Sequence, residues 1–254
     1  MEKENLIVAM FLDKYKLMIK TNEITNTNFL TPNEQLHARD LILKGAIRSC
    51  FLYGGTAEAE RKQLVFFPDY YDENKAKAVF DNIICLRINP KVGFGKLVHK
   101  DYLGALLGLG LKREKIGDIF VAENEARVFV CREIKDFIIG NLLQVGRYSC
   151  EVSIQTEVLA LQNAEMLEEK IVIASLRLDV VIAATFRMAR AKANQTIIAG
   201  MVQINWLLID KPDQQLKIGD TISVRKKGRI EIIAVEGISK KQRIIVIIKK
   251  YCSK

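Results

Sequence analysis

The sequence is poor in the residues that build disulfide frameworks and metal sites. Among 254 residues there are five cysteines, two histidines, four prolines and one tryptophan. The cysteines are odd in number, widely spaced and without a CxxC pair, so neither a disulfide framework nor a zinc site is indicated. We interpret them as small, buried apolar residues. They are Cys50, Cys85, Cys131, Cys150 and Cys252.

Long apolar runs are also missing. The longest uncharged apolar stretch, residues 102–111, is far shorter than the ~18 to 20 residues needed to span a bilayer. The start MEKENLIVAMFLDKYK has two acids in its first four residues and lacks the basic start and the cleavage site of a signal peptide. We therefore expect a cytoplasmic protein with no membrane span.

The positive charge is concentrated at one end of the chain. The net charge is +9, and an apolar fraction of 49% is enough for two or three small domains. Residues 175–254 carry 16 Lys and Arg against 6 Asp and Glu, whereas residues 1–174 carry 23 against 24. A basic domain attached to a neutral body indicates a binder of polyanions. We favour nucleic acid over an acidic membrane, because a membrane binder needs a basic amphipathic helix and this tail is β-like.

The hydrophobic pattern predicts an α+β fold of several parts. Helices are expected over residues 4–20 and 31–45, and the second carries a capping box formed by Thr31 and Glu34. Two β-rich runs follow around Gly54-Gly55, which we interpret as a turn, because no GK[ST] follows the glycines as it does in a phosphate loop.

Residues 79–156 give the order β-α-β-β-α-β, which is that of ferredoxin-like and RNA-recognition-motif-like domains. RNA-binding sheets of this type stack bases on exposed aromatic residues, and only Phe129 is placed to serve here. The predicted segments are an N-terminal α+β region (1–76), a ferredoxin-like middle domain (77–158), a linker (159–174) and a basic domain with two helices on a small sheet (175–254).

Cations gather in the basic domain where a helix disfavours them. Arg187, Arg190 and Lys192 fall at the join between the two expected helices or in the first turn of the second, near the positive end of its dipole. A phosphate would resolve this conflict, since helix amides and Arg side chains would bind it together. Freely solvated cations are the alternative. The expected RNA-binding residues of this domain are Arg177, Arg187, Arg190, Lys192, Arg225, Lys226, Lys227 and Arg229.

Two further charged clusters lie outside the basic domain. Lys112, Arg113 and Lys115 follow a helix end loosened by Gly108 and Gly110, where they either cap the helix or make a second phosphate contact. The stretch 60–62 (Glu-Arg-Lys) is interpreted as a solvated cluster in preference to an RNA contact.

The segment RLDVVIAATFRMARAKANQTIIAGMVQINW…KPDQQLKIGDTISVR resembles the RNA-binding domain named after ribosomal protein S-four of the small subunit. In that domain two helices and a β turn grip structured RNA. Two positions depart from the pattern: Ala189 stands where a Ser usually precedes the arginine, and Trp206 stands where a Gly usually follows Asn205. Asp179 is expected to orient Arg177 or an adjacent helix. Trp206 either stacks on a base or packs in the core.

Over nearly its whole length the chain also resembles the YlmH family of bacterial proteins. The motifs GGTAEAERKQLVFFPDY, LGLGLKREKIGDI and ASLRLDVVIAATFRMARAKA carry this resemblance. It implies a cytosolic factor that binds rRNA, with tRNA as a further partner, and associates with the ribosome, in particular with a large subunit still carrying peptidyl-tRNA. A role linked to cell division is the alternative that the resemblance leaves open.

An RNA-modifying enzyme is the competing hypothesis, because pseudouridine synthases and methyltransferases carry the same RNA-binding domain. Neither His37 nor His99 has the spacing to Cys, Ser or carboxylates that a catalytic triad or a metal site needs. Residues 45–80 are too short for a methyltransferase cofactor unit. We therefore expect no enzymatic activity, no metal and no small-molecule cofactor.

Overall fold

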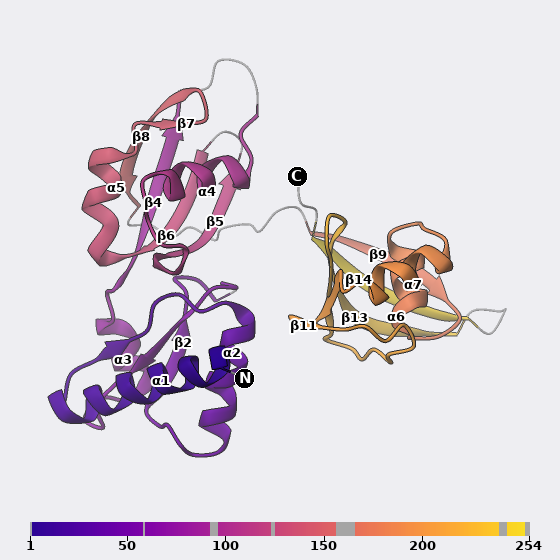
Figure 1. Cartoon of the computed structure of the whole chain (residues 1–254), viewed down its shortest axis with the longest axis horizontal. Coiled ribbons are helices and arrows are strands. Elements are labelled where there is room, and N and C mark those ends of the chain that lie inside the picture. Colours follow the sequence, from indigo (N-terminus) through magenta and orange to yellow (C-terminus); the bar gives the residue numbers. More distant parts are fainter. Residues whose placement is uncertain are drawn as a thin grey trace. The chain divides into compact units, whose positions relative to one another are not determined.

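The computed structural model describes residues 2–57, 59–91, 96–122, 125–155, 166–238 and 243–251. The chain forms two compact units, Met1–Leu161 and Gln162–Lys254. Each unit has a hydrophobic core of its own, and the first unit combines the N-terminal region and the middle domain that the sequence predicted as separate parts (Figure 1). The fold is therefore of the mixed α+β class.

The N-terminal region packs two helices on a small sheet. Thr31 caps the second helix: its hydroxyl accepts from the Glu34 amide, and the Glu34 carboxylate accepts from the Thr31 amide, so the predicted capping box is confirmed. Phe11, Leu64 and Phe66 are fully buried between helix and sheet. The strands are antiparallel in the order β1-β3-β2. The elements are α1 (Glu2–Thr21), β1 (Thr25–Asn26), α2 (Pro32–Leu43), β2 (Cys50–Tyr53), β3 (Gln63–Phe66) and α3 (Glu73–Val79).

The middle domain has the predicted order β-α-β-β-α-β, extended by one short strand. Its antiparallel sheet has the order β5-β6-β4-β8-β7. Tyr102 of the first helix and Ile138 of the second lie in one core with Leu86 and Val128 of the sheet, so both helices cover the same face. The elements are β4 (Ile83–Pro90), α4 (His99–Gly108), η1 (Arg113–Lys115), β5 (Ile116–Ala122), β6 (Glu125–Cys131), η2 (Arg132–Ile134), α5 (Lys135–Asn141), β7 (Gln144–Val145) and β8 (Tyr148–Ile154).

The opposite face of this sheet is partly covered by the N-terminal region. Phe129 is 1% exposed and packs in a cluster with Phe29 and Cys85. A Cβ atom added to Gly55, whose φ is +98°, would lie 2.2 Å from the Phe129 ring. The aromatic side chain that the sequence offered for base stacking is therefore buried by packing, and Phe129 is not available to RNA.

Arg61 fastens the N-terminal region to the middle domain. Its Nε donates to the carbonyl of Ile116 at 3.2 Å and its Nη2 to the carbonyl of Phe29 at 3.0 Å. The Asp118 carboxylate accepts from the backbone amides of Glu60 at 2.6 Å and of Arg61 at 3.2 Å. Burial lowers the pKa of Arg61 and raises that of Asp118. The interpretation of residues 60–62 as a solvated cluster is wrong for Arg61, which holds two parts of the unit together.

The C-terminal unit has a six-stranded antiparallel sheet of order β11-β10-β12-β13-β14-β9. Leu178, Val181 and Ile197 of its two helices are buried against the sheet residues Ile222 and Ile248. The elements are β9 (Met166–Ile173), α6 (Leu178–Thr185), α7 (Arg190–Ile198), β10 (Val202–Ile204), β11 (Leu207–Leu208), β12 (Thr221–Val224), β13 (Gly228–Ile238) and β14 (Ile244–Tyr251).

The sheet is larger than the sequence predicted, because β9 comes from the expected linker 159–174. All eight residues of β9 pair with β14, the last strand. Read by itself, this acidic segment has the composition of a linker. In the structure it is an edge strand, because it pairs with β14, which is distant in the sequence. The rest of the expected linker up to residue 165 lies outside the described residues.

Candidate nucleic-acid interface

Asp179 links the two helices of the C-terminal unit through two arginines. Its carboxylate is 1% exposed; one oxygen accepts from Nε of Arg177 at 3.1 Å and the other from Nε of Arg190 at 2.8 Å. Burial alone raises the pKa of Asp179, but the hydrogen bonds and charges of the two arginines outweigh it and hold the pKa below its ordinary value. The expectation that Asp179 orients Arg177 and an adjacent helix is confirmed.

These ion pairs account for two of the four cations Arg177, Arg187, Arg190 and Lys192. Arg177 precedes α6, and Arg190 is the first residue of α7, whose N-cap Ala189 makes no side-chain hydrogen bond. The buried carboxylate therefore offsets the charge that the helix dipole disfavours. Because 36% of the Arg177 side chain and 57% of the Arg190 side chain remain exposed, both guanidinium groups also face solvent in a fixed orientation.

Arg187 occupies a backbone position that favours glycine. The Met188 amide donates a hydrogen bond to the carbonyl of Ala183, and α6 ends there. Arg187 lies within this turn and has a φ of +49°, in the left-handed region. Its side chain is 88% exposed, and its one ion pair with a described residue is a 3.9 Å contact with Glu169 of β9. An arginine at such a position costs about 1 kcal/mol against glycine and contributes little packing in return. Lys192, two residues into α7, is also exposed, with no ion pair among the described residues.

A second group of cations lies in the turn between β12 and β13. Arg225, Lys226 and Lys227 are all exposed, and Lys226 has a φ of +64°. The Arg225 amide donates to the carbonyl of Met201, which follows α7, so this turn lies beside the end of that helix. Like Arg187, Lys226 is a cation in a conformation that favours glycine. Such strain at exposed positions is a feature of functional sites.

Arg229 lies between two aromatic rings. Its guanidinium carbon is 5.9 Å from the centre of the Trp206 ring and 6.0 Å from that of Tyr251, and its Nε donates to the Ser223 hydroxyl at 3.1 Å. Trp206 is half-buried and has a φ of +66°, which explains why glycine is usual at this position in the resembling domain. Arginine and aromatic faces together are a surface on which unpaired bases stack.

Lys250 is a further cation of this unit, and the sequence did not indicate it as a binding residue. Its Nζ lies 5.9 Å from the centre of the Phe186 ring and 3.9 Å from the Glu169 carboxylate, which also pairs with Arg187. Only the pairing of β9, β13 and β14 brings the last strand next to the helix join. The sequence offered one hint of this contact, the acidic residue Glu169, with which both Lys250 and Arg187 pair. Glu169, however, lies in the segment that we interpreted as a linker.

The predicted cluster of Lys112, Arg113 and Lys115 is divided by the structure. Arg113 binds the carbonyls of Ile116 and Gly117, and burial and the nearby Arg61 lower its pKa to about 10. The Lys115 ammonium donates to Asn28 at 2.7 Å and pairs with Glu133. Lys112 alone of the three is exposed. Arg113 therefore braces its own turn and Lys115 links it to Asn28, so the three do not form a common basic surface.

The remaining candidate groups are buried or separate. Burial raises the pKa of Cys85 and of Cys131 to about 11, so both are neutral thiols. Burial and the charge of Arg113 lower the pKa of His99, while His37 lies on α2. Within the described ranges, no group of three or more His, Cys, Asp or Glu is arranged to hold a metal, and no helix is long and apolar enough to cross a membrane.

Part of the chain matches a family model, and nearly the whole chain is similar to a Bacillus protein. Residues 80–158 match the family model described as "Putative RNA-binding domain in YlmH", which is the middle domain and not the basic C-terminal unit. The chain is 29% identical over 243 residues to the ribosome-associated protein quality control protein P2 of Bacillus subtilis (strain 168), covering 94% of this chain and 92% of that protein.

A solved structure is similar in fold to part of this chain. It is that of the cell division protein ylmH from Streptococcus pneumoniae, at 18% identity and a TM-score of 0.50, covering 60% of this chain and 91% of that one. At this identity the likeness concerns the fold alone. The domain match and the nearly full-length similarity to the Bacillus protein support the resemblance of this chain to the YlmH family.

Proposed function

We propose that this chain is a non-catalytic, cytoplasmic RNA-binding factor that associates with the ribosome. The observation that carries the proposal is the placement of exposed cations at Arg187 and Lys226, where the backbone favours glycine. Folding gains little from either side chain. Arg177 and Arg190, held by Asp179, add two oriented guanidinium groups suited to bidentate phosphate contacts.

The basic unit binds structured RNA in the manner of the domain of ribosomal protein S-four. The unit has both oriented arginines and the group of Trp206, Arg229 and Tyr251. It can therefore bind backbone phosphates as well as an unpaired base. The match of residues 80–158 to an RNA-binding domain supports a second contact from the middle domain. rRNA is the proposed partner, with tRNA as a further one.

We further propose that the chain acts on large subunits that still carry peptidyl-tRNA, in quality control of obstructed translation. The name of the Bacillus relative, which has similarity over 94% of this chain, supports the ribosome-associated quality-control part of this proposal. The protein then acts by occupying its site and by holding RNA, and its own residues make or break no covalent bond.

Co-sedimentation tests the proposal. The purified protein is centrifuged with whole ribosomes, free small subunits, free large subunits and large subunits carrying peptidyl-tRNA, each at low and at physiological salt. We expect selective recovery with the loaded large subunit. Substituting Arg187 and Arg190 by Ala should abolish it, while the charge-matched pair Lys211→Ala and Lys217→Ala should retain most of it.

Three other outcomes of the co-sedimentation experiment would each change a different part of the proposal. Binding to no ribosomal particle would overturn the ribosome assignment and leave a free RNA substrate, an RNA-modifying activity or a cell-division partner to be tested. Equal binding to empty and loaded large subunits would retain the RNA-binding function but overturn the role of peptidyl-tRNA. Loss of binding in both pairs of variants would show that only total charge matters.

A further inference from the structure

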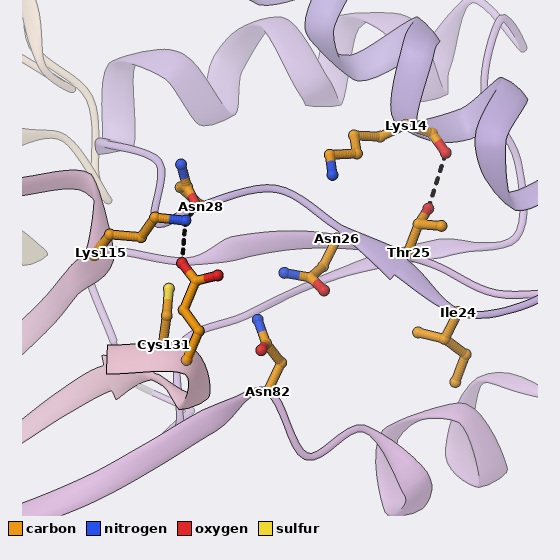
Figure 2. Close-up of a pocket in the computed structure, with 9 residues that line it drawn as sticks. Lys14, Ile24, Thr25, Asn26, Asn28, Asn82, Lys115 and Cys131 are labelled. Atoms are coloured by element: carbon orange, nitrogen blue, oxygen red, sulfur yellow. Dashed lines mark hydrogen bonds and ion pairs between the residues drawn. The ribbon is translucent and has the colours of Figure 1, made fainter. Parts of the chain in front are cut away.

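A polar pocket lies in the first unit, where the N-terminal region meets the end of the middle sheet (Figure 2). Its volume is about 290 Å³, near the lower limit of small-ligand sites. Asn82 immediately precedes β4, Lys115 immediately precedes β5, and Cys131 ends β6, so three strand ends form one wall. The lining residues are Lys14, Ile24, Thr25, Asn26, Asn28, Asn82, Lys115, Cys131 and Glu133.

A buried glutamine fixes the amides of this pocket. The Gln63 side chain is inaccessible to solvent; its oxygen accepts from Asn26 at 3.0 Å and from Asn82 at 3.2 Å, and its nitrogen donates to the Cys131 sulfur at 3.2 Å. The Asn26 nitrogen also donates to the carbonyl of Thr27 at 2.9 Å. Both amide nitrogens are thus engaged, whereas within the described residues the side-chain oxygens of Asn26 and Asn82 accept no hydrogen bond. The lining therefore includes two amide oxygens that are free to accept hydrogen bonds from a ligand, as far as the described residues show.

The opposite side of the pocket offers a cation. The half-buried Lys14 side chain extends from α1 toward the pocket (Figure 2), and its ammonium makes no hydrogen bond or ion pair with any described residue. Lys115, in contrast, is engaged by Asn28 and Glu133. With one carboxylate against two ammonium groups, the lining has an excess positive charge. The site therefore suits a ligand with an anionic group at one end and hydrogen-bond donors at the other.

We propose that this pocket binds a single ribonucleotide, with its phosphate against Lys14 and the exocyclic amino group of its base against the oxygens of Asn26 and Asn82. The inference rests on the proposed RNA-binding function and extends it to a site outside the basic unit. Asn82, Lys115, Cys131 and Glu133 belong to the matched RNA-binding segment, 80–158. Because Phe129 is buried, the sheet of that segment needs another place to receive a base.

The chemistry predicts which nucleotides bind. Adenine, cytosine and guanine carry an exocyclic amino group, whereas uracil presents only carbonyls and one ring N–H at its pairing edge. Two acceptors therefore favour the first three, and inorganic phosphate fills only the Lys14 end. The nucleotide is either free or an unstacked residue of an RNA strand, and both sources share the same contacts.

Nuclear magnetic resonance of the full chain tests the proposal. The side-chain amide signals of Asn26 and Asn82 are followed during titration with AMP, CMP, UMP, inorganic phosphate and single-stranded hexamers of A and of U. We expect both signals to shift with AMP and CMP, and only weakly with UMP or phosphate. Lys14→Ala should weaken AMP binding about tenfold, as expected for loss of a charged hydrogen bond. Lys14→Arg should restore it in part, and the exposed Lys16→Ala on the same helix should not change it.

The different probes in the titration distinguish the possible ligands. Shifts with the A hexamer but not with free AMP would assign the site to RNA strands, and shifts with both would assign it to nucleotides in general. Equal shifts with inorganic phosphate and AMP, or no shift with any probe, would overturn the nucleotide site. Co-sedimentation of Lys14→Ala with ribosomal particles separates this result from the proposed function, since ribosome binding through the basic unit would survive loss of the pocket.

Discussion

The Asp179 carboxylate accepts a hydrogen bond from Nε of Arg190 at 2.8 Å and thereby joins the first turn of α6 to the first residue of α7. Its other oxygen holds Arg177. Asp179→Asn should lower the free energy of unfolding of the C-terminal unit by about 1 to 3 kcal/mol, because a neutral amide cannot compensate two arginines.

Urea titration followed by fluorescence measures this change cleanly. The single tryptophan, Trp206, lies in the C-terminal unit and therefore reports its unfolding alone. The exposed Asp210→Asn, which removes the same charge, should stay within about 0.5 kcal/mol of the parent chain. Equal effects of the two substitutions would show that the buried carboxylate has no special role.

The same carboxylate predicts a dependence on pH. The pKa of Asp179 is held below its ordinary value in the folded state, so its contribution to stability is present above the unfolded pKa of about 3.9 and is lost as the pH falls through the folded pKa. The difference in stability between the parent chain and Asp179→Asn should therefore be largest near pH 7 and shrink below about pH 4. A constant difference across this range would contradict the ion pairs as its origin.

Arg187 should affect RNA binding without supporting the fold. Arg187→Ala should reduce the dependence of log affinity on log salt by about 0.9, the value of one phosphate contact, and leave stability nearly unchanged. Arg187→Gly should bind as weakly but raise stability by about 1 kcal/mol, because its backbone φ is +49°. Filter binding over a salt series and Trp206 fluorescence measure the two effects. An unaltered salt slope would remove Arg187 from the interface.

Gly55 should be intolerant of a side chain. In Gly55→Ala the new Cβ would meet the buried Phe129 ring at 2.2 Å on a backbone of φ +98°, which should destabilise the first unit by about 2 to 4 kcal/mol. Gly104, inside α4, has no atom within 4 Å of such a Cβ, so Gly104→Ala should be neutral or stabilise by up to about 1 kcal/mol. Far-ultraviolet circular dichroism during urea unfolding distinguishes them, and similar midpoints would contradict the packing.

The sequence alone predicted the local elements well where local chemistry specifies them. The capping box of α2 depends on Thr31 and Glu34, three residues apart, and the end of α4 depends on Gly108 and Gly110, two residues apart. The alternation of the middle strands likewise follows from short-range patterning. The excess of charge after residue 175 predicted the basic unit, and the resemblance to the RNA-binding domain of ribosomal protein S-four led to the expectation that Asp179 orients Arg177 or an adjacent helix.

Only the tertiary structure decided which charged side chains face solvent and which hold the fold together. Arg61 was interpreted as part of a solvated cluster, yet it binds the carbonyls of Phe29 and Ile116, because segments distant in the chain pack around it. Strand β9 and the position of Lys250 depend on pairing across some 80 residues, which no local pattern specifies. Composition fixed the amount of positive charge in each part of the chain. Long-range packing determined which of these charged side chains are exposed to solvent and accessible to a binding partner.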